Sequence, residues 1–347
     1  MLHFDYDYMA GAHPDVLRRL VETNLEQTSG YGYDEYTQRA ESLILEACGI
    51  TPSADGTPRG RVFFLVGGTQ TNATVIDGLL ARHEGVLAAE TAHVNVHEAG
   101  AIEAGGHKVI VLPSHNGKVL ADEVDNYISN FYRDDTCQHM VAPGMLYISF
   151  PTELGTLYSL SELEALHATC QHHHIPLYID GARLGYGLAA TEDVTLHDIA
   201  RLSDVFYIGG TKVGTLFGEA VVVKDPGLLP HFFSLIKQHG ALLAKGRLTG
   251  IQFETLFSDD LYMRISRHAV AMAMKMKAAF VAKGYRLFID SPTNQQFFIL
   301  PNADMDRLMQ HASFEVWGTR GKDETPVRLV TDWSTREEDI DHLINLL

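Results

Sequence analysis

Short β-branched or aromatic runs alternate with longer amphipathic segments through the middle of the chain, and this alternation restricts the possible folds more than any other feature. An amphipathic segment at 161–172 places Leu163, Leu166 and Cys170 on one helical face. Strands that alternate with helices form βαβ units. We therefore predict an α/β fold, with a mostly parallel seven-stranded sheet covered by helices on both faces. The expected strands are 62–66, 86–89, 108–112, 146–150, 177–180, 205–208 and 220–223.

The pattern changes after Asp225. A long helical region rich in Met and Ala is expected at about 248–283. It is followed by predicted strands at 297–300, 314–317 and 327–330 and by predicted helices at 303–311 and 336–346. These elements predict a large domain over residues 1–247 and a smaller α+β domain over residues 248–347. Residues 1–25 are expected to pack with the smaller domain.

Charge and hydropathy exclude several classes of protein. Lys plus Arg is 27 and Asp plus Glu is 44, and the resulting net charge of −17 repels nucleic acids and anionic membranes. The three cysteines are widely spaced without a CxxC pair, which is typical of a reducing compartment and indicates neither disulfide nor zinc frameworks. No signal peptide or apolar run of about 18 residues is present. We expect a soluble cytoplasmic protein with no nucleic-acid or membrane partner.

Polar residues follow several predicted strands, and ligands of open parallel sheets bind at the carboxyl ends of their strands. Gly67, Gly68 and Thr69 follow the first of the seven strands and begin a helix. Such a turn binds phosphate through free N–H groups and the helix dipole, or is a tight turn capped by Thr69. Asp180 ends another strand, where a buried carboxylate needs a cationic or hydrogen-bonding partner, such as Arg183 or the start of the next helix.

Further candidates lie between and after these strands. Lys212, in the segment GGTKVG, would become a nucleophilic amine if burial lowered its pKa, or would be a solvated loop lysine. His93 and His97 share a face at helical spacing, but no third ligand or HExxH pattern accompanies them, so we expect no metal site. Arg328 lies in a predicted strand and needs an anion, either a substrate carboxylate or a structural Asp.

The order of these features resembles the pyridoxal-phosphate enzymes of the aspartate-aminotransferase fold, fold type I. Within that fold the chain is most similar to the threonine aldolase and β-eliminating lyase family. The resemblance extends from Tyr31-Gly32-Tyr33-Asp34 through GGTQTN, AHVNVHEAG, YIDGARL and GGTK to VRLVTDW. Its most specific element is Asp180-Gly181-Ala182-Arg183 followed by Lys212.

The resemblance implies pyridoxal 5′-phosphate (PLP) as the cofactor and a role for each matching residue. Lys212 would form a Schiff base with the cofactor aldehyde, and Asp180 would bond to the protonated pyridine nitrogen. His93 would stack on the ring, while Gly68 and Thr69 would hold the phosphate. Lys212, His93 and Asp180 are thus the expected catalytic residues.

The resemblance also implies substrate-binding residues and an oligomer. Arg183 would lie near the phenolic oxygen of the cofactor or the substrate carboxylate, and Arg328 would clamp that carboxylate. Tyr31 would reach the site, from the neighbouring subunit of a homodimer or homotetramer with shared active sites.

The implied activity is that of a lyase of amino-acid metabolism. It would cleave a β-hydroxy-α-amino acid, L-threonine or L-allo-threonine, to glycine and an aldehyde by Schiff-base retro-aldol chemistry. The alternatives are β-elimination or transamination of another amino acid with the same cofactor, and PLP binding without catalysis.

Two segments differ from the family pattern. Family members begin with Arg-Ser-Asp, whose serine helps to bind the substrate carboxylate, whereas this chain has Tyr6-Asp7-Tyr8-Met9-Ala10. A later Glu-Asn-Thr-His-Asn segment of the family places a histidine near the substrate hydroxyl, whereas this chain has Pro151-Thr152-Glu153-Leu154-Gly155-Thr156. Retro-aldol cleavage needs a base for the β-hydroxyl proton. His93, His97, Glu153 or a water would have to accept it.

Overall fold

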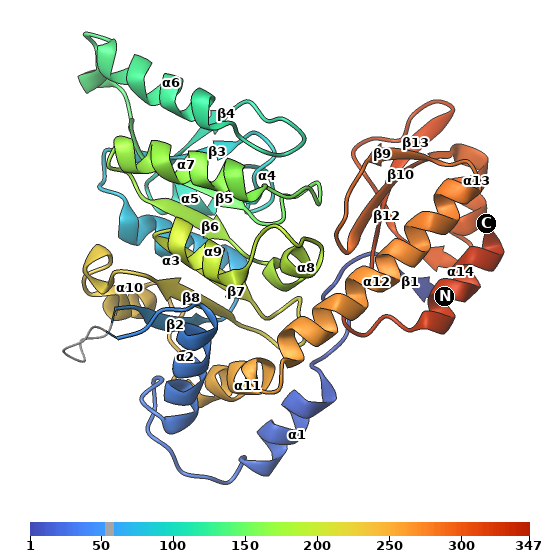
Figure 1. Cartoon of the computed structure of the whole chain (residues 1–347), viewed down its shortest axis with the longest axis horizontal. Helices are drawn as coiled ribbons and strands as arrows, with labels where there is room; N and C mark the ends of the chain where they lie inside the picture. The colour runs from blue at the N-terminus through green and yellow to red at the C-terminus, as the bar shows by residue number, and fades with distance from the viewer. Residues whose placement is uncertain (53–58) are drawn as a thin grey trace.

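The computed structural model describes residues 1–52 and 59–347, and a mixed sheet of seven strands lies at its centre (Figure 1). The strand order is β2-β8-β7-β6-β5-β3-β4. The strands β3 to β7 pair in parallel, whereas β8 runs antiparallel to both of its neighbours, β2 and β7. Each predicted run overlaps one strand, and the predicted fold class is confirmed. The strands are β2 (Arg61–Leu65), β3 (Glu84–Ala89), β4 (Lys108–Leu112), β5 (Ala142–Ser149), β6 (Leu177–Asp180), β7 (Val205–Gly209) and β8 (Glu219–Val223).

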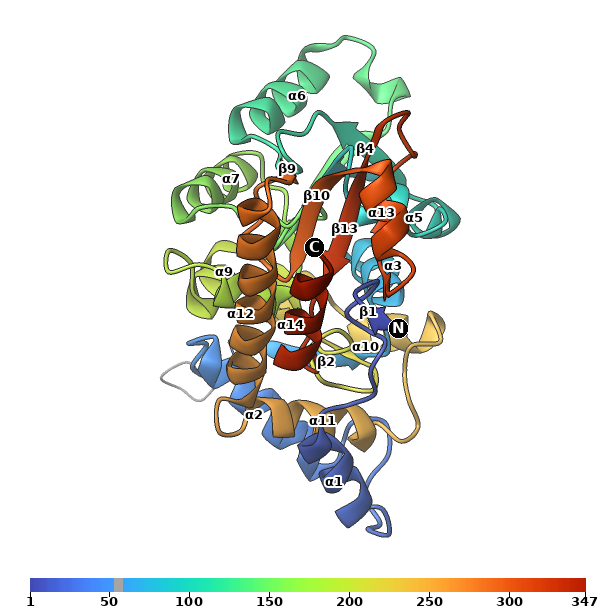
Figure 2. The same ribbon diagram turned by 90° about the vertical axis from the view of Figure 1, so that its right-hand side faces the viewer.

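Helices cover both faces of this sheet, as Figures 1 and 2 show from two directions. One face carries α3 (Gly68–Leu79), α5 (Ala101–Ala104) and α10 (Phe232–Gln238). The other carries α6 (Ala121–Arg133), α7 (Leu160–His172) and α9 (Leu196–Leu202). The chain also forms α1 (Pro14–Glu22), α2 (Glu35–Ala47), α4 (His93–Val96), α8 (Leu184–Ala189) and two short 3-10 turns, Cys137–His139 and Pro226–Leu228.

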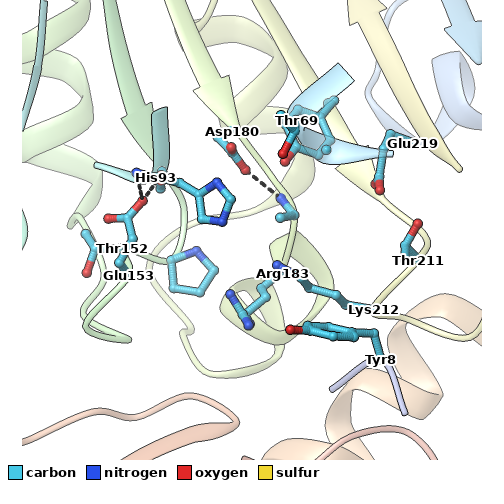
Figure 3. A pocket seen from close by; sticks show the side chains of 15 residues that line it. Tyr8, Thr69, His93, Thr152, Glu153, Asp180, Arg183, Thr211, Lys212 and Glu219 are labelled. Carbon is cyan, nitrogen blue, oxygen red and sulfur yellow. Dashed lines mark hydrogen bonds between the residues drawn. The ribbon is translucent and has the colours of Figure 1, made fainter. Parts of the chain in front are cut away.

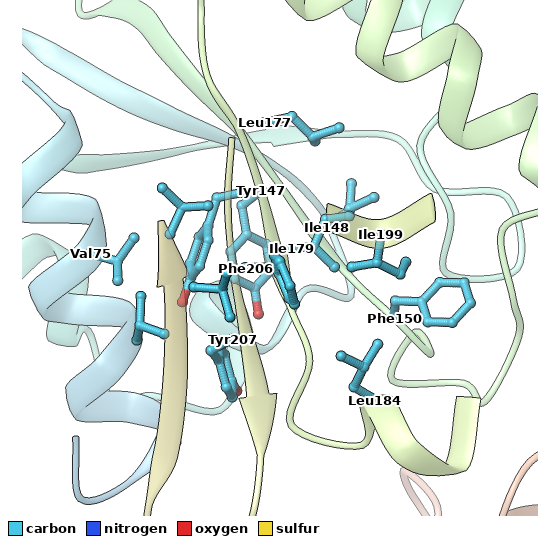
Figure 4. Close-up of a cluster of buried hydrophobic side chains, with 14 of the residues drawn as sticks. Val75, Tyr147, Ile148, Phe150, Leu177, Ile179, Leu184, Ile199, Phe206 and Tyr207 are labelled. Atoms are coloured by element: carbon cyan, nitrogen blue, oxygen red, sulfur yellow. The ribbon is translucent and has the colours of Figure 1, made fainter. Parts of the chain in front are cut away.

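The core of the sheet is built by alternation along its central strands (Figure 4). Successive strand residues point to opposite faces, so Tyr147 lies on the side of α3 and Ile148 on the side of α9. Tyr147, Tyr178 and Tyr207 are all fully or almost fully buried. A buried tyrosine needs a partner for its hydroxyl group. These hydroxyl groups are therefore available to polar side chains at the ends of the strands.

A smaller unit follows at the C-terminal end. Its antiparallel sheet has the order β12-β13-β10-β9, and a parallel pair of two-residue strands, β1 and β11, lies beside it. Strand β9 was not among the predicted elements, because its exposed and half-buried residues alternate without a strong apolar run. The elements are β1 (Leu2–His3), β9 (Arg286–Ile289), β10 (Gln295–Pro301), α13 (Asn302–Leu308), β11 (Ala312–Ser313), β12 (Glu315–Val316), β13 (Glu324–Val330) and α14 (Glu337–Leu346).

The predicted helical region at 248–283 consists of two helices in the structure, and the break between them was not predicted. These are α11 (Arg247–Phe257) and α12 (Leu261–Ala282), separated where Asp259 and Asp260 adopt positive φ angles of 53° and 56°. Aspartate tolerates this left-handed conformation better than most residues, and it ends a right-handed helix. The helical spacing of apolar residues continued across the break, so the sequence pattern did not reveal it.

The two helices contact different parts of the molecule. Helix α11 packs against α1 and α2, whereas α12 runs from α8 to α14 and joins the two units (Figure 1). Phe4 belongs to the core of the C-terminal unit, while α1 lies against α11. The division at residue 247 stays a prediction. None of the helices in the described residues is long and apolar enough to span a membrane.

Gly181 provides a test of how tightly the end of β6 is packed. A Cβ at this position would lie 1.9 Å from the carbonyl oxygen of Tyr207, whereas a Cβ at Gly11 would meet nothing within 4 Å. We expect Gly181→Ala to lower the free energy of unfolding by about 3 kcal/mol, since neither backbone can yield easily. Gly11→Ala should leave it within about 1 kcal/mol. Chemical denaturation measures both, and equal stabilities would contradict the described packing.

Candidate active site

The carboxyl ends of β2, β6 and β7 meet at one edge of the large sheet and enclose a cavity of about 230 Å³ (Figure 3). Parallel strands bring such ends together, as the sequence predicted. The cavity is lined by Tyr8, Gly68, Thr69, His93, Ser149, Pro151, Thr152, Glu153, Asp180, Ala182, Arg183, Tyr207, Thr211, Lys212 and Glu219. Seven residues named as candidates from the sequence are among them: Gly68, Thr69, His93, Glu153, Asp180, Arg183 and Lys212.

The turn after β2 leads directly into α3. Helix α3 begins at Gly68, and its N-cap is Gly67, which provides no side-chain cap. The alternative of a turn capped by Thr69 is therefore wrong, since Thr69 lies inside the helix. The first N–H groups of a helix have no intrahelical partner, and the helix dipole makes this end favourable for an anion. Gly68 and Thr69 thus offer a site for a phosphate group.

Asp180 is a buried carboxylate with partners on β5, on α3 and in the turn after β6. Its Oδ2 accepts hydrogen bonds from Tyr147 Oη at 2.6 Å and Asn72 Nδ2 at 2.9 Å, and its Oδ1 accepts one from Ala182 N at 2.9 Å. Burial raises the pKa of Asp180, but the nearby His93 and these hydrogen bonds outweigh burial and lower it overall. The side chain is therefore held as an anion that faces the cavity.

The neighbouring His93 is connected to Asp180 through two side chains. Its Nδ1 lies 2.7 Å from Glu98 Oε1, and that same oxygen accepts a hydrogen bond of 2.7 Å from Asn72. Tyr178 Oη donates to Asn72 Oδ1 at 2.8 Å. Glu98 is 4 % exposed, so the imidazole is oriented from behind by a buried acid. Sequence reasoning identified His93 but neither Glu98 nor Asn72, although both lie within quoted family motifs.

Lys212 lies on the loop after β7, with its side chain on the cavity wall (Figure 3). Among the described residues, no carboxylate oxygen lies within 4.0 Å of its amine. Loss of solvation and the charge of Arg183 lower the pKa of Lys212 to about 8, although Asp7, Asp180 and Glu219 act in the opposite direction. About a tenth of the amine is thus unprotonated at pH 7, far more than for an ordinary lysine, and this form is the nucleophile.

Arg183 is held by Asp7, in the segment that departs from the family pattern. Its Nε and Nη2 donate to the two carboxylate oxygens of Asp7 at 2.7 and 3.0 Å, and Asn294 Nδ2 donates to Asp7 Oδ2 at 3.0 Å. Burial raises the pKa of Asp7, but the charges of Arg183 and Lys212 and these hydrogen bonds lower it overall. The N-terminal segment is thereby fixed at the cavity, and Tyr8 becomes part of its wall (Figure 3).

The other departing segment places Glu153 beside His93 (Figure 3). Glu153 Oε1 accepts hydrogen bonds from His93 N at 3.0 Å and Ser149 Oγ at 2.6 Å. Burial raises the pKa of Glu153; the hydrogen bond from Ser149 acts against this, and the charge of Asp180 adds to it. No hydrogen bond joins its Oε2 to another described residue. Glu153 therefore has one anchored oxygen and one that can exchange a proton.

Arg328 lies in an adjoining cavity of about 270 Å³, which shares Tyr8, His93, Glu153, Arg183 and Lys212 with the first. Its Nη2 is 2.5 Å from Glu315 Oε2, its Nη1 donates to Gln295 at 2.9 Å, and its guanidinium lies 5.2 Å from the Trp317 ring. Its buried Nε has no hydrogen-bond partner in the described part of the chain. His97 also lines this cavity, where burial and the charge of His93 lower its pKa.

Tyr31 does not reach either cavity within its own chain. It is 43 % exposed and lines a separate cavity of about 380 Å³, with Lys237 Nζ 4.7 Å from its ring centre. Its expected substrate role therefore requires a second copy of the chain and stays a prediction.

Glu219 is a cavity residue that sequence reasoning missed. Site residues were expected at the carboxyl ends of strands, whereas Glu219 is the first residue of β8. Because β8 runs antiparallel to its neighbours, its first residue lies at the edge where β2 and β7 end. The predicted strand began at residue 220. Glu219 was therefore visible in the sequence beside a predicted strand, but at its amino end and not at its carboxyl end.

Away from the cavity, one group of potential metal ligands occurs among the described residues. Asp125, His172 and His173 have ligand atoms within 4.8 Å of one another, between α6 and α7. His173 Nε2 lies 2.7 Å from Asp125 Oδ1, so an ion pair or hydrogen bond already accounts for their proximity.

With the geometry in place, comparison with known proteins identifies the family. Residues 7–290 match the beta-eliminating lyase family. The chain belongs to this family. The family predicted from the residues is confirmed.

Two individual relatives are similar to this chain along most of its length. The low-specificity L-threonine aldolase of Pseudomonas aeruginosa is 29 % identical over 311 residues, covering 88 % of this chain and 86 % of the relative. The structure of the Leishmania major threonine aldolase superposes with a TM-score of 0.94 at 39 % identity, covering 100 % of this chain and 98 % of that one.

The fold extends to more distant proteins. The serine palmitoyltransferase of S. paucimobilis, solved with PLP and myriocin bound, superposes with a TM-score of 0.68 at 15 % identity. It covers 99 % of this chain and 85 % of that one. At this identity the similarity shows the fold alone, and it places this beta-eliminating lyase family member among fold type I structures.

The cavity has the donor set that PLP requires. An anionic phosphate fits the uncapped start of α3 at Gly68 and Thr69. A protonated pyridine nitrogen fits the buried anion of Asp180, and an aldehyde fits the amine of Lys212, which no described carboxylate engages. His93 and Ala182 line the cavity as well and can bound a flat ring.

The buried pair of Asp7 and Arg183 predicts a pH-dependent stability. Because the folded-state pKa of Asp7 is lowered, its contribution is present above the unfolded pKa of about 3.9 and is lost as pH falls through the folded value. We expect Asp7→Asn to lower the free energy of unfolding by about 3 kcal/mol near neutral pH, with a difference that shrinks below about pH 4. Urea denaturation at several pH values measures it.

The matched control is Asp15→Asn, which removes an exposed ion pair with Arg18. We expect it to change stability by less than about 1 kcal/mol. A difference between Asp7→Asn and the natural chain that stays constant with pH would contradict the assigned charge of Asp7.

Proposed function

We propose that this chain is a PLP-dependent aldolase that cleaves a β-hydroxy-α-amino acid, L-threonine or L-allo-threonine, to glycine and an aldehyde. The observation that carries the proposal is the joint placement of the anionic Asp180, the amine of Lys212 and the uncapped start of α3 around one cavity. The similarity to threonine aldolases of Pseudomonas aeruginosa and Leishmania major supports the choice of reaction.

Bound PLP would supply a positively charged ring that accepts the electron pair of the broken Cα–Cβ bond. The residues of the chain would support this chemistry. Asp180 would hold the proton on the pyridine nitrogen, because its own pKa is lowered and it stays anionic. Lys212 would provide the amine that attaches the cofactor and is displaced by the substrate amine. His93, oriented by Glu98, would cover one face of the ring.

Two arginines would orient the substrate carboxylate. Arg183 uses its Nε and Nη2 for Asp7, and no hydrogen bond joins its Nη1 to another described residue, so Nη1 is left for a ligand. The Nε of Arg328 has no hydrogen-bond partner among the described residues, while its Nη2 pairs with Glu315. A carboxylate in the adjoining cavity would satisfy the buried Nε, and both arginines face the space beside Lys212. This would hold the scissile bond in a fixed direction.

We also propose Glu153 as the base for the β-hydroxyl proton, in place of the family histidine that this chain lacks. Its Oε1 is anchored by Ser149 and the His93 N–H, while its Oε2 is free of described partners. Its raised pKa brings it closer to neutral pH, where a general acid–base group is most effective. His97, His93 and water are the other candidates.

Assembly and location are part of the same proposal. A homodimer or homotetramer with shared sites would bring Tyr31 of a second copy to the cavity, since Tyr31 lies elsewhere in its own chain. A cytoplasmic location agrees with the three free cysteines, Cys48, Cys137 and Cys170.

The first test concerns Lys212. After incubation with PLP and reduction with borohydride, we expect mass spectrometry to find the cofactor on the peptide that contains Lys212. Lys212→Ala should lose this adduct and at least about 1,000-fold of the rate of aldehyde release from threonine, because the nucleophilic amine is gone. Lys224→Ala, which removes an exposed lysine whose Nζ donates to the Arg201 carbonyl, is the control and should retain both.

Other products would reject the aldolase assignment. Ammonia and a keto acid from the amino acid would indicate β-elimination, and amino-group exchange with a keto acid would indicate transamination. A cofactor adduct with no turnover of any amino acid would leave a PLP-binding protein without catalysis.

The second test separates the role of Glu153 from cofactor chemistry in general. Exchange of the glycine α-proton with solvent needs no base for a β-hydroxyl group, whereas threonine cleavage does. We expect Glu153→Gln to slow threonine cleavage by about 100-fold or more and to leave glycine exchange within about threefold. NMR in deuterated water measures exchange. Equal losses in both reactions would contradict the proposed role of Glu153. His97→Gln, which alters another candidate base, serves as the matched variant for the same two measurements.

A further inference from the structure

Glu219 lies between the two glycine-containing turns of the cavity. The register of the sheet pairs it with Leu65 at the end of β2 and with Gly209 at the end of β7. The chain after Leu65 forms the turn to Gly68 and Thr69, and the chain after Gly209 leads to Thr211 and Lys212. One acid therefore lies beside both the expected phosphate turn and the lysine loop, and Figure 3 shows it on the side of Thr69 and Thr211.

The carboxyl group of Glu219 is buried and held from one side. The residue is 3 % exposed, and its Oε2 accepts a hydrogen bond from Gly210 N at 3.2 Å. The Thr211 hydroxyl also bonds to this carboxyl, while it accepts a hydrogen bond from Gly218 N at 3.0 Å. These contacts orient Glu219 at the cavity wall without providing a cation within ion-pair distance.

The charged and titratable groups around Glu219 come from several elements. Lys212 on the loop after β7 favours its charged form, whereas Asp180 on β6 disfavours it. Burial and, to a smaller extent, the charge of Glu219 raise the pKa values of the phenols of Tyr178, Tyr207 and Tyr262. Burial dominates and raises the pKa of Glu219 to about 8, so that the carboxyl group is mostly neutral near pH 7.

We propose that Glu219 binds the phosphate group of the cofactor as a neutral carboxylic acid, donating a hydrogen bond from its O–H to a phosphate oxygen. This role rests on the proposed function, because it requires a phosphate at the start of α3. A carboxylate at this place would repel a phosphate dianion, whereas a carboxylic acid is a strong donor to it. The phosphate in turn keeps the proton on Glu219.

A purely structural role would leave a different signature. An acid that only fixes the Gly210–Thr211 turn would affect ligands with and without a phosphate group equally. A phosphate donor changes the affinity for phosphorylated ligands alone, and its effect disappears when the acid ionises. The pH dependence of phosphate recognition therefore distinguishes the two roles.

The experiment compares pyridoxine 5′-phosphate with pyridoxine on cofactor-free protein. Neither compound has an aldehyde, so neither becomes attached to Lys212. The ratio of their dissociation constants, from calorimetry or fluorescence, reports the contribution of the phosphate group without any turnover. Between about pH 7 and pH 9.5 the phosphate stays a dianion, since its second pKa is about 6, so its own titration does not enter.

We expect the preference for the phosphorylated ligand to fall by roughly tenfold or more across this range in the natural chain. Glu219→Gln, whose amide donates at every pH, should keep its preference at pH 7 and lose most of the decline. Lys212 titrates in the same range, so both proteins are also compared in a Lys212→Arg background, which keeps the positive charge beside Glu219 at every pH used and where the difference should persist. Glu153 is an acid on the other side of the cavity, so Glu153→Gln should retain the decline in phosphate preference.

The outcomes separate this proposal from the proposed function. If pyridoxine 5′-phosphate and PLP both fail to bind the natural chain, the cofactor assignment fails. If the phosphorylated ligand binds but Glu219→Gln and the natural chain show the same pH dependence, the role of Glu219 is overturned and the cofactor assignment stands. Should Glu219→Gln fail to fold, the Lys212→Arg protein alone decides, because the charge beside Glu219 is kept there and a preference that does not decline rejects the proposal.

Discussion

The buried negative charge of Asp180 is the constraint on which the rest of the site depends. A carboxylate at the end of a central strand is stable only if hydrogen bonds and nearby positive charge replace its lost solvation. Tyr147 and Asn72 supply the hydrogen bonds, and His93 supplies the favourable electrostatic interaction. The same Asn72 holds Glu98, which orients His93, so one buried network fixes both the acid and the ring beside it.

Around this anion, burial and neighbouring charges set the protonation state of each acid and base of the cavity. Asp7 is ionised because Arg183 binds both of its oxygens, whereas burial raises the pKa of Glu219 and favours its neutral form. Burial and the charge of Arg183 lower the pKa of Lys212 to about 8, while the nearby acids act against this shift. Overall charge, −17 for the chain, says nothing about this distribution, since each pKa follows from the local surroundings.

Much of the site could be read from the sequence, because its residues follow apolar runs that are recognisable as strands. Asp180, Lys212, Gly68 and Thr69 are examples, since parallel strands bring their carboxyl ends to one edge. Glu219 could not be found in this way, because nothing local shows that β8 runs against its neighbours. The break between α11 and α12 was also hidden, because apolar periodicity continued across it.

The sequence by itself determined the βαβ framework, the family and the residues that precede or follow each strand, since these are properties of local pattern and motif. Tertiary structure alone decided which distant residues meet. Asp7 and Arg183, 176 positions apart, form a buried ion pair that no spacing rule predicts. Strand direction and long-range contact depend on how whole segments pack, and the ionisation of Glu219 depends on both, so these properties appear only when the chain is folded.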